Sequence, residues 1–240
     1  MQNINNFVPA ITYVSLNNPN EFHTESIHAF KSGALCGYCN QALITNPCNT
    51  DELQAMHAYF GTLPYTAWTK IQLNEHTQDF RAQEINLLMA AKLGTIAPAT
   101  VKNEITVREL TDKSDIARIW IPLVAPLFGT TAAEFTRFIA YLQQTSIAKK
   151  LHYFIALLNG VPAAASMLIV HDNFIAVDWV GTLPAYRHQG LGYAVTCNAL
   201  HMLNDNGDKP VVLLSSAAGE ALYKKIGLSV VDQYNVYMHS

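Results

Sequence analysis

Two glycines lie two positions apart between a segment with strand character and a segment with helix character. The stretch RHQGLG, residues 187–192, follows the apolar run IAVDWVGT and opens the helical pattern GLGYAVTCNALHML. Glycine lets a backbone approach a ligand closely, and the N–H groups of a helix's first turn have no partners inside the helix. Because the helix dipole adds favourable charge there, this arrangement suits an anion such as a pyrophosphate.

Other phosphate-binding loops fit this stretch less well. The pattern GxxxxGK[ST] is absent, and a dinucleotide GxGxxG would need glycine where Val195 stands. Two glycines that open a helix can also serve close packing alone. The glycines therefore need support from the elements around them.

The second half of the chain alternates strand and helix signals. We predict a strand at 104–110, helices within 111–120 and 132–145, and three strands within 151–182 with turns at 159–160 and 171–173. A helix at 190–203, a strand at 211–216, a helix at 219–226 and final strands within 229–238 follow. Gly207 and Gly227 are expected just beyond the two helices, and Ser215 or Ser216 can cap the second.

The first half carries strand and helix patterns but no chemical motif. We predict a strand around 34–45, a helix at 51–60 started by Thr50 or Asp51, a strand at 65–73 and an amphipathic helix over 79–93. The segment GTIAPATVKN, residues 94–103, is rich in Gly, Pro and Thr and reads as a linker. The sequence thus predicts two domains, residues 1–101 and 102–240.

Composition excludes several classes of protein. Half of the 240 residues are hydrophobic and the net charge is −3, so the chain can bury a core but carries no basic field for nucleic acid. The longest apolar run, 119–128, is interrupted by Pro122 and Pro126 and is too short to cross a membrane. Residues 1–16 lack the pattern of a secretory signal. We therefore expect a soluble, cytoplasmic protein without nucleic-acid or membrane partners.

Four cysteines are too few and too unevenly spaced for a disulfide framework. Cys36 and Cys39 in CGYC, with Cys48 and His28, suggest a zinc site, but a second matching pair of ligands is lacking. Small reduced thiols in a buried strand are the favoured interpretation. No metal is predicted.

Two ordered motifs resemble the Gcn5-related N-acetyltransferase (GNAT) superfamily. RHQGLG matches the family's R/Q-x-x-G-x-G/A signature and follows VGTLPAYR, and GEALYKKIGL, about 28 residues farther on, is similar to a second family segment. The resemblance covers residues 105–237 and implies a mixed α/β fold with a central mixed sheet flanked by helices. Residues 1–101 resemble the smaller, degenerate companion domain of two-domain members.

The resemblance also implies a donor site for acetyl-CoA between two strands that splay apart. The backbone would pair with the pantetheine arm at Val180, Gly181 and Thr182, and the pyrophosphate would be held by N–H groups at His188, Gln189, Gly190, Leu191 and Gly192. Arg187 either contacts a phosphate or is only a nearby surface cation. Ser216 stands where many members have a cofactor-contacting asparagine.

Acetyl transfer to an amine needs a base, an acid and a polarised carbonyl. By resemblance, Tyr223 faces the CoA sulfur as general acid or thiolate stabiliser; alternatively it only packs its helix on the sheet. Asp178 is the candidate base, because in a regular strand it shares a face with Val180; a bulge would turn it away. Ordered water is an alternative proton carrier. An N–H near Val180 would act as an oxyanion donor.

Some positions depart from the family pattern. Leu228 replaces the usual phenylalanine, and His188-Gln189 replaces Gly-Arg or Gly-Lys, but no required backbone N–H is lost. We therefore predict an enzyme that moves acetyl from acetyl-CoA to an amine by direct attack in a ternary complex. The alternative is a non-catalytic CoA-binding sensor or interaction module. The sequence leaves open the identity of the amine acceptor, the acyl-chain preference and whether the protein forms a homodimer. The apolar segment 120–138 either lines a pocket or belongs to the core.

Overall fold

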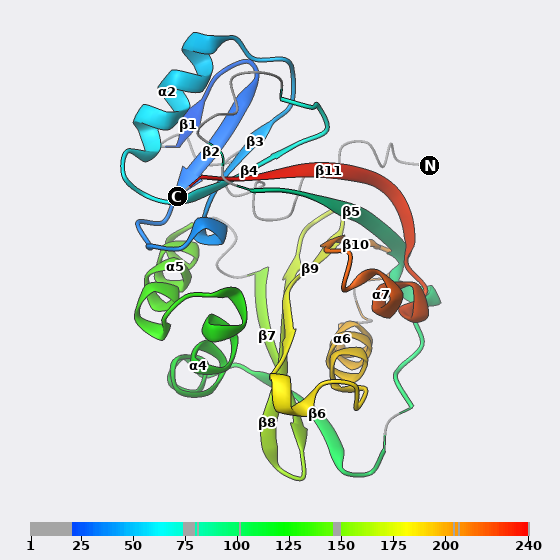
Figure 1. The fold of residues 1–240 in the computed structure, drawn as a ribbon. Coiled ribbons are helices and arrows are strands. Elements are labelled where there is room, and N and C mark those ends of the chain that lie inside the picture. The colour runs from blue at the N-terminus through cyan, green and yellow to red at the C-terminus, as the bar shows by residue number, and fades with distance from the viewer. Residues whose placement is uncertain are drawn as a thin grey trace. The chain divides into compact units, whose positions relative to one another are not determined.

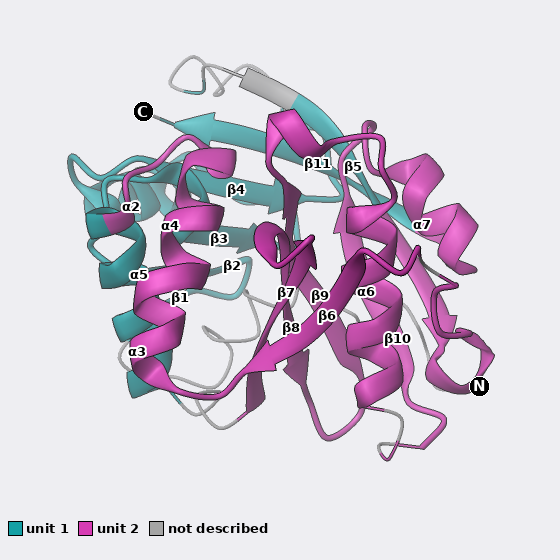
Figure 2. Ribbon diagram, turned by 90° about the horizontal axis from the view of Figure 1, so that it is seen from below, with its two compact units in different colours: residues 1–87, 133–148, 232–240 teal, residues 88–132, 149–231 magenta. Residues whose placement is uncertain are grey.

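The chain divides into two compact units in the computed structural model (Figure 2), which describes residues 21–73, 80, 82–100, 102–145, 150–203, 205 and 207–239. Unit 1 comprises residues 1–87, 133–148 and 232–240, and unit 2 comprises residues 88–132 and 149–231. Each unit contains residues from both sides of the predicted boundary at residue 101. The division into domains 1–101 and 102–240 stays a prediction. The prediction that residues 1–16 contain no secretory signal concerns residues outside the described ranges.

Unit 1 combines a sheet with two helices (Figure 1). Its elements are β1 (Phe22–His23), β2 (Ile27–Lys31), β3 (Asn40–Ile44), α2 (Thr50–Phe60), β4 (Tyr65–Thr69) and nearly all of α5 (Ala132–Gln144). Two further strands, β5 (Ala82–Lys92) and β11 (Ser229–His239), contribute residues to both units. The strand order in this part of the sheet is β1-β2-β3-β4-β11, with β3 and β4 parallel and the other neighbouring pairs antiparallel.

Helix α2 begins where the sequence provides a capping box. The Asn49 side chain accepts a hydrogen bond from the Glu52 N–H (2.9 Å), and the Glu52 carboxylate accepts one from the Asn49 N–H (3.2 Å). Both bonds satisfy donors that a helix start leaves free. The helix then packs its apolar side on β2, β3, β4 and β11 through Leu53, Met56 and Phe60.

The predicted helix over 79–93 is wrong, because residues Ala82–Lys92 form strand β5. Leu and Met favour helices intrinsically, and their apolar pattern is ambiguous between a buried strand and a helix. Successive residues Leu88 and Met89 are both buried, as expected for a strand covered on its two faces. Tertiary pairing therefore overrides local propensity here.

Unit 2 is a mixed sheet with helices on both sides. Its own elements are β6 (Ile105–Leu110), α3 (Lys113–Asp115), α4 (Ile121–Val124), β7 (Leu151–Leu158), β8 (Val161–Val170), β9 (Ile175–Thr182), α6 (Leu191–Met202), β10 (Pro210–Ser215) and α7 (Glu220–Ile226). The strand order is β5-β10-β9-β8-β7-β6; β6 to β9 form an antiparallel meander, and β10 joins β9 in parallel. The predicted three-strand meander is confirmed, and the helical segment after β6 is continued by a π-helical turn at Ile116–Trp120.

Helices on the two sides of the sheet both contact β8. Helix α6 contacts β6, β7, β8 and β9, whereas α4 contacts β8, and the two helices lie on opposite faces of these strands in Figures 1 and 2. On the α4 side, fully buried Trp120 donates from Nε1 to the Ser166 carbonyl oxygen (3.2 Å) and packs edge-on against Tyr153. The predicted fold class, a mixed sheet flanked by helices, is confirmed.

Candidate active site

Strands β9 and β10 part soon after they meet. Their parallel ladder consists of the pairs Val211↔Ile175 and Val212↔Ala176, while β9 continues to Thr182 and β10 to Ser215. Within the described residues of these two strands, the backbone of β9 beyond Ala176 has no ladder partner on β10. Such an open strand edge can pair with an extended ligand. The predicted pantetheine residues, Val180 to Thr182, lie on this stretch.

A β-bulge interrupts β9 inside the same stretch. Ala165 pairs with Gly181 and Met167 with Asp178, so two β9 residues oppose the single residue Ser166. One of the two, Trp179, has a left-handed backbone (φ 49°), which is rare for a bulky side chain. The strand is therefore not regular between Asp178 and Val180, and the expectation that these residues share a face of a regular strand is wrong.

Asp178 carries a carboxyl group in an environment that disfavours its charge. Burial raises the pKa of Asp178 to about 7, and a hydrogen bond from the Trp179 N–H (2.8 Å) partly opposes that rise. Among the described residues, Asp178 takes part in no ion pair. A carboxyl group that titrates near neutrality can exchange protons at physiological pH.

Tyr223 lies within electrostatic reach of Asp178. Burial and then the Asp178 charge raise the pKa of Tyr223, so its hydroxyl stays protonated at neutral pH. The ring packs on the backbone of Gly219, where an added Cβ would come within 2.9 Å of Tyr223 Cε2 and 2.9 Å of Ser215 Oγ. The structure thus places the two predicted catalytic residues, from β9 and α7, within electrostatic reach of each other. The structure also shows that Gly219 lies against the Tyr223 ring, whereas the sequence marks Gly219 only as a glycine before a helix.

The predicted anion loop ends on a helix start that no side chain caps. Gly190 is the N-cap residue of α6, with a left-handed backbone (φ 84°), and its carbonyl accepts the first helical hydrogen bond from Ala194 (2.9 Å). His188 is also left-handed (φ 61°). Gly192 has ordinary space around it, since an added Cβ would lie 3.4 Å from Thr182 Oγ1. This loop fits an anion held by backbone N–H groups.

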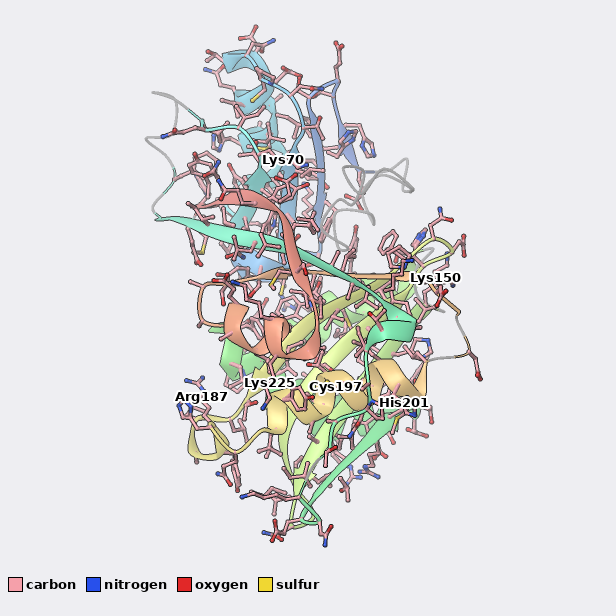
Figure 3. The ribbon with its side chains drawn as sticks, turned by 90° about the vertical axis from the view of Figure 1, so that its right-hand side faces the viewer. Lys70, Lys150, Arg187, Cys197, His201 and Lys225 are labelled. Carbon is pink, nitrogen blue, oxygen red and sulfur yellow. The ribbon has the colours of Figure 1, made fainter. Side chains whose placement is uncertain are left out.

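Two cations lie near this helix start. Arg187 donates from Nε to the Thr182 carbonyl oxygen (3.2 Å), and Lys225 Nζ lies 4.7 Å from the ring centroid of Tyr193 in the first turn of α6. Figure 3 shows Arg187 on the loop beside α6 and Lys225 on α7. Among the described residues Lys225 forms no ion pair, whereas the adjacent Lys224 is paired with Glu220 (2.6 Å). The sequence-based prediction did not include Lys225 among the cofactor-binding residues, although Lys225 is visible in the sequence as the second lysine of YKKIG.

Ser216 lies in the turn before α7 and is exposed. Its carbonyl oxygen accepts hydrogen bonds from the Gly219 N–H (3.0 Å) and from Ser215 Oγ (2.8 Å). These bonds fix the turn through the backbone. The predicted cap at Ser215 or Ser216 is wrong, because the N-cap residue is Gly219 and no side chain caps α7.

Part of the apolar segment 120–138 covers β9. Leu127 lies over Gly181, where an added Cβ would be 2.6 Å from Leu127 Cδ1, and the Phe128 ring packs edge-on against Trp179 at 4.7 Å. Trp120 belongs to the core instead. The segment therefore supplies both core and the apolar surroundings of the bulge.

No group of three or more metal-ligating side chains occurs in the described part of the chain. Cys36 and Cys39 are buried and form no disulfide, and Cys48 is half-buried. In the same residues, no single helix has the length and apolar character of a membrane span, although the helical segments Lys113–Phe128 and Ala132–Gln144 reach that criterion when counted together.

Comparison with known proteins identifies the family of this site. The model of the Acetyltransferase (GNAT) family matches residues 121–228, which contain Asp178, the 187–192 loop and Tyr223. Residues 121–228 are therefore a GNAT acetyltransferase domain, and the resemblance predicted from the sequence is confirmed. A comparison with curated proteins finds no match.

Solved structures share the fold at low sequence identity. A GCN5-related N-acetyltransferase from Kribbella flavida has a TM-score of 0.64 and 14% identity, with 97% of this chain and 96% of that chain covered. A functionally unknown conserved protein from Staphylococcus epidermidis ATCC 12228 gives 0.68 and 14%, covering 93% and 94%. A GCN5-related N-acetyltransferase from Sphaerobacter thermophilus gives 0.62 and 16%, covering 89% and 76%. The predicted GNAT fold is confirmed, and the family supports acyl transfer in general.

Proposed function

We propose that the protein transfers an acetyl group from acetyl-CoA to an amine by direct attack in a ternary complex. The observation that carries this proposal is that Asp178 lies within electrostatic reach of Tyr223, on the strand whose edge opens away from β10. A titratable carboxyl and a protonated phenol are the base and acid that aminolysis of a thioester requires. Both lie in unit 2, together with the whole proposed donor site.

The donor site fits a CoA thioester on two observations. The free edge of β9 offers backbone groups of Val180, Gly181 and Thr182 to an extended pantetheine chain. The uncapped start of α6 offers N–H groups from His188 to Gly192 to the pyrophosphate, with Arg187 as an added cation. Bound acetyl-CoA would supply the activated acyl group. Ser216 would contact the donor from the turn before α7.

Asp178 is proposed to take the proton that the amine loses as it attacks. With a pKa of about 7, the carboxyl is substantially ionised at neutral pH and still basic enough to accept a proton. Its ionised form also attracts the ammonium form of the acceptor into an otherwise apolar setting.

Tyr223 is proposed to protonate or hydrogen-bond the departing sulfur. Its raised pKa keeps the hydroxyl protonated, so it serves as donor and not as base. The backbone N–H of Val180, in the bulge, is proposed to donate to the thioester carbonyl oxygen. Base, acid and oxyanion donor then come from β9 and α7.

The test incubates the full-length protein with acetyl-CoA and a panel of small amines, amino acids, drug-like amines and peptide N-termini, and follows the release of free thiol. We expect amine-dependent thiol release, which the Asp178→Asn and Tyr223→Phe variants reduce. Saturable CoA binding without thiol release from any amine would instead favour a sensor or interaction module. If CoA does not bind, the donor-site assignment is wrong.

A further inference from the structure

Two histidines face each other across the first hairpin of unit 1. His23 on β1 pairs directly with His28 on β2, and their Nδ1 atoms lie 3.1 Å apart. We infer that His23 and His28 form a two-ligand site for a divalent late transition-metal ion such as Ni²⁺ or Zn²⁺. The site is separate from the proposed acetyl transfer and does not depend on it.

The distance between the two nitrogens suits a shared metal. With metal–nitrogen bonds of about 2.0–2.1 Å, nitrogens 3.1 Å apart subtend roughly 100° at the ion, between the tetrahedral and octahedral angles. Without a metal, two neutral imidazoles can share only one proton between these atoms, one donating and the other accepting. A metal ion uses both lone pairs at once, and imidazole nitrogen favours nickel, copper and zinc over magnesium or calcium.

The hairpin holds the backbone of the two histidines in place before any ion binds. Thr24 Oγ1 accepts hydrogen bonds from the N–H groups of Ser26 (3.2 Å) and Ile27 (3.0 Å) across the turn. The same hydroxyl donates to Glu52 Oε1 (2.7 Å), and Glu52 is fixed in turn by the capping box of α2. Little backbone ordering therefore remains to be done on binding, which favours affinity.

The site is accessible and incomplete. Phe22 packs against Tyr59 of α2 (5.4 Å), so the next residue along β1, His23, faces the other side of the hairpin, where it is exposed. The described residues offer no third ligand in a group with these two. Water or a small external ligand would complete the coordination, so the bound ion exchanges and is removed by chelators.

The experiment titrates Ni²⁺ into the full-length protein, freed of any affinity tag, by calorimetry, and measures the shift in Tm in parallel. We expect one ion per chain at this site and a higher Tm with Ni²⁺, because an ion that binds only the folded state stabilises it. His23→Gln and His28→Gln should each weaken binding by more than about tenfold and abolish the Tm shift. His201→Gln, which changes an exposed histidine on α6 (Figure 3), is the matched control and should bind as the wild type does.

Two results would overturn the inference: no Ni²⁺ binding by the wild type, or binding that survives in both hairpin variants. His23 is exposed, so His23→Gln should retain the wild-type Tm in the absence of metal. That variant stays informative even if His28→Gln fails to fold. Acetyl transfer measured with and without chelator should be equal, which separates this site from the proposed active site.

Discussion

Trp179 holds a strained backbone at the point where the proposed chemistry takes place. A bulky residue in the left-handed region costs on the order of 1–3 kcal/mol, and here the ladder to β8 on both sides and the Phe128 ring hold it there. The bulge inserts one residue between Asp178 and Gly181 and so re-aims the backbone of Val180. Strain at this residue is therefore coupled to the geometry of the proposed oxyanion donor.

Replacing Tyr223 by phenylalanine separates chemistry from binding. Tyr223→Phe keeps the ring that packs on Gly219 but removes the hydroxyl, so we expect CoA affinity to hold while kcat falls about 10²- to 10⁴-fold. Calorimetry with CoA and turnover on the identified amine measure the two effects. Turnover within about threefold of wild type would show that the thiolate leaves unaided or through water. A collapse of CoA affinity would show a structural role.

Asp178→Asn should change activity and stability in opposite directions. The folded pKa of Asp178 is raised, so the wild type loses stability as pH rises from the ordinary pKa of 3.8 to about 7 and stays at that lower level above it. The asparagine variant lacks this titration, so its Tm advantage should be larger at pH 8 than at pH 5. Its kcat should fall about 10²- to 10⁴-fold. A Tm difference that is the same at both pH values would contradict the assigned burial of the carboxyl.

At the candidate site, the sequence identifies candidate residues but not the backbone geometry that orients them. Tyr223 follows from a family-like motif and Asp178 from its place two residues before Val180, and the structure places them within electrostatic reach of each other. The bulge has no sequence marker, since its left-handed residue is a tryptophan instead of a glycine. Lys225 and Gly219 lie within the quoted segment GEALYKKIGL, but the contacts that single them out, with Tyr193 and with Tyr223, arise from the packing of α7.

Helix α6 is the element on which the proposed donor binding depends. Gly190→Asp forces a side chain into a left-handed backbone and places a negative charge at the uncapped helix start, so we expect CoA affinity to fall by more than about tenfold. Gly207→Asp is the matched control, because Gly207 has a similar φ (69°) and open surroundings but follows the other end of the helix. Calorimetry with CoA compares the two variants. Equal losses would mean that backbone strain, and not the phosphate site, causes the effect.

Helix α7 offers two adjacent lysines with different surroundings. Lys225 approaches the first turn of α6 at Tyr193, whereas Lys224 is held by Glu220. We expect Lys225→Met to weaken CoA binding severalfold and to reduce its salt dependence, because an unpaired cation near phosphates acts through screened attraction. Lys224→Met should leave both nearly unchanged. Titrations at low and high salt measure the effect, and identical behaviour of the two variants would remove Lys225 from the phosphate site.

Elements with short-range signals are predicted well, and elements decided by tertiary pairing are not. The β7–β9 meander is marked by turns such as Asn159-Gly160, both left-handed in the structure, and α6 by its apolar period. Strand β5 has the residues of a helix, and only its place between β10 and β11 in the strand order makes it a strand. Such long-range pairing leaves no local trace in the sequence.

At the scale of the whole molecule, the chain passes between the two units several times. Residues 133–148 leave unit 2 for unit 1 and the chain then returns, and β11 begins in unit 2 and ends in unit 1. A linker rich in Gly, Pro and Thr marks a change of local composition, but it does not show where the chain's contacts divide. We keep the smaller companion domain as a proposal, with residues 1–101 binding no CoA alone.

The predicted boundary at residue 101 and the unit boundary at residue 87 give different expectations for a shortened chain. Residues 88–100 contribute buried Leu88, Met89 and Leu93 to unit 2, and the Leu93 N–H donates to the Lys209 carbonyl oxygen (3.0 Å). The Ala99 N–H likewise donates to Asn198 Oδ1 on α6 (3.0 Å). A fragment of residues 102–240 loses all of these contacts, while a fragment of residues 88–240 keeps them.

We therefore expect the 102–240 fragment to be much less stable than the 88–240 fragment, since each fully buried large apolar side chain contributes about 1.5–3 kcal/mol. Both fragments carry the same segments of unit 1, so the difference in their Tm reports residues 88–101 alone. Thermal unfolding and binding of a hydrophobic dye measure it, and CoA titration shows whether the donor site survives. Equal Tm and equal CoA affinity in the two fragments would place the domain boundary at residue 101, because residues 88–101 would then contribute nothing that the catalytic half needs.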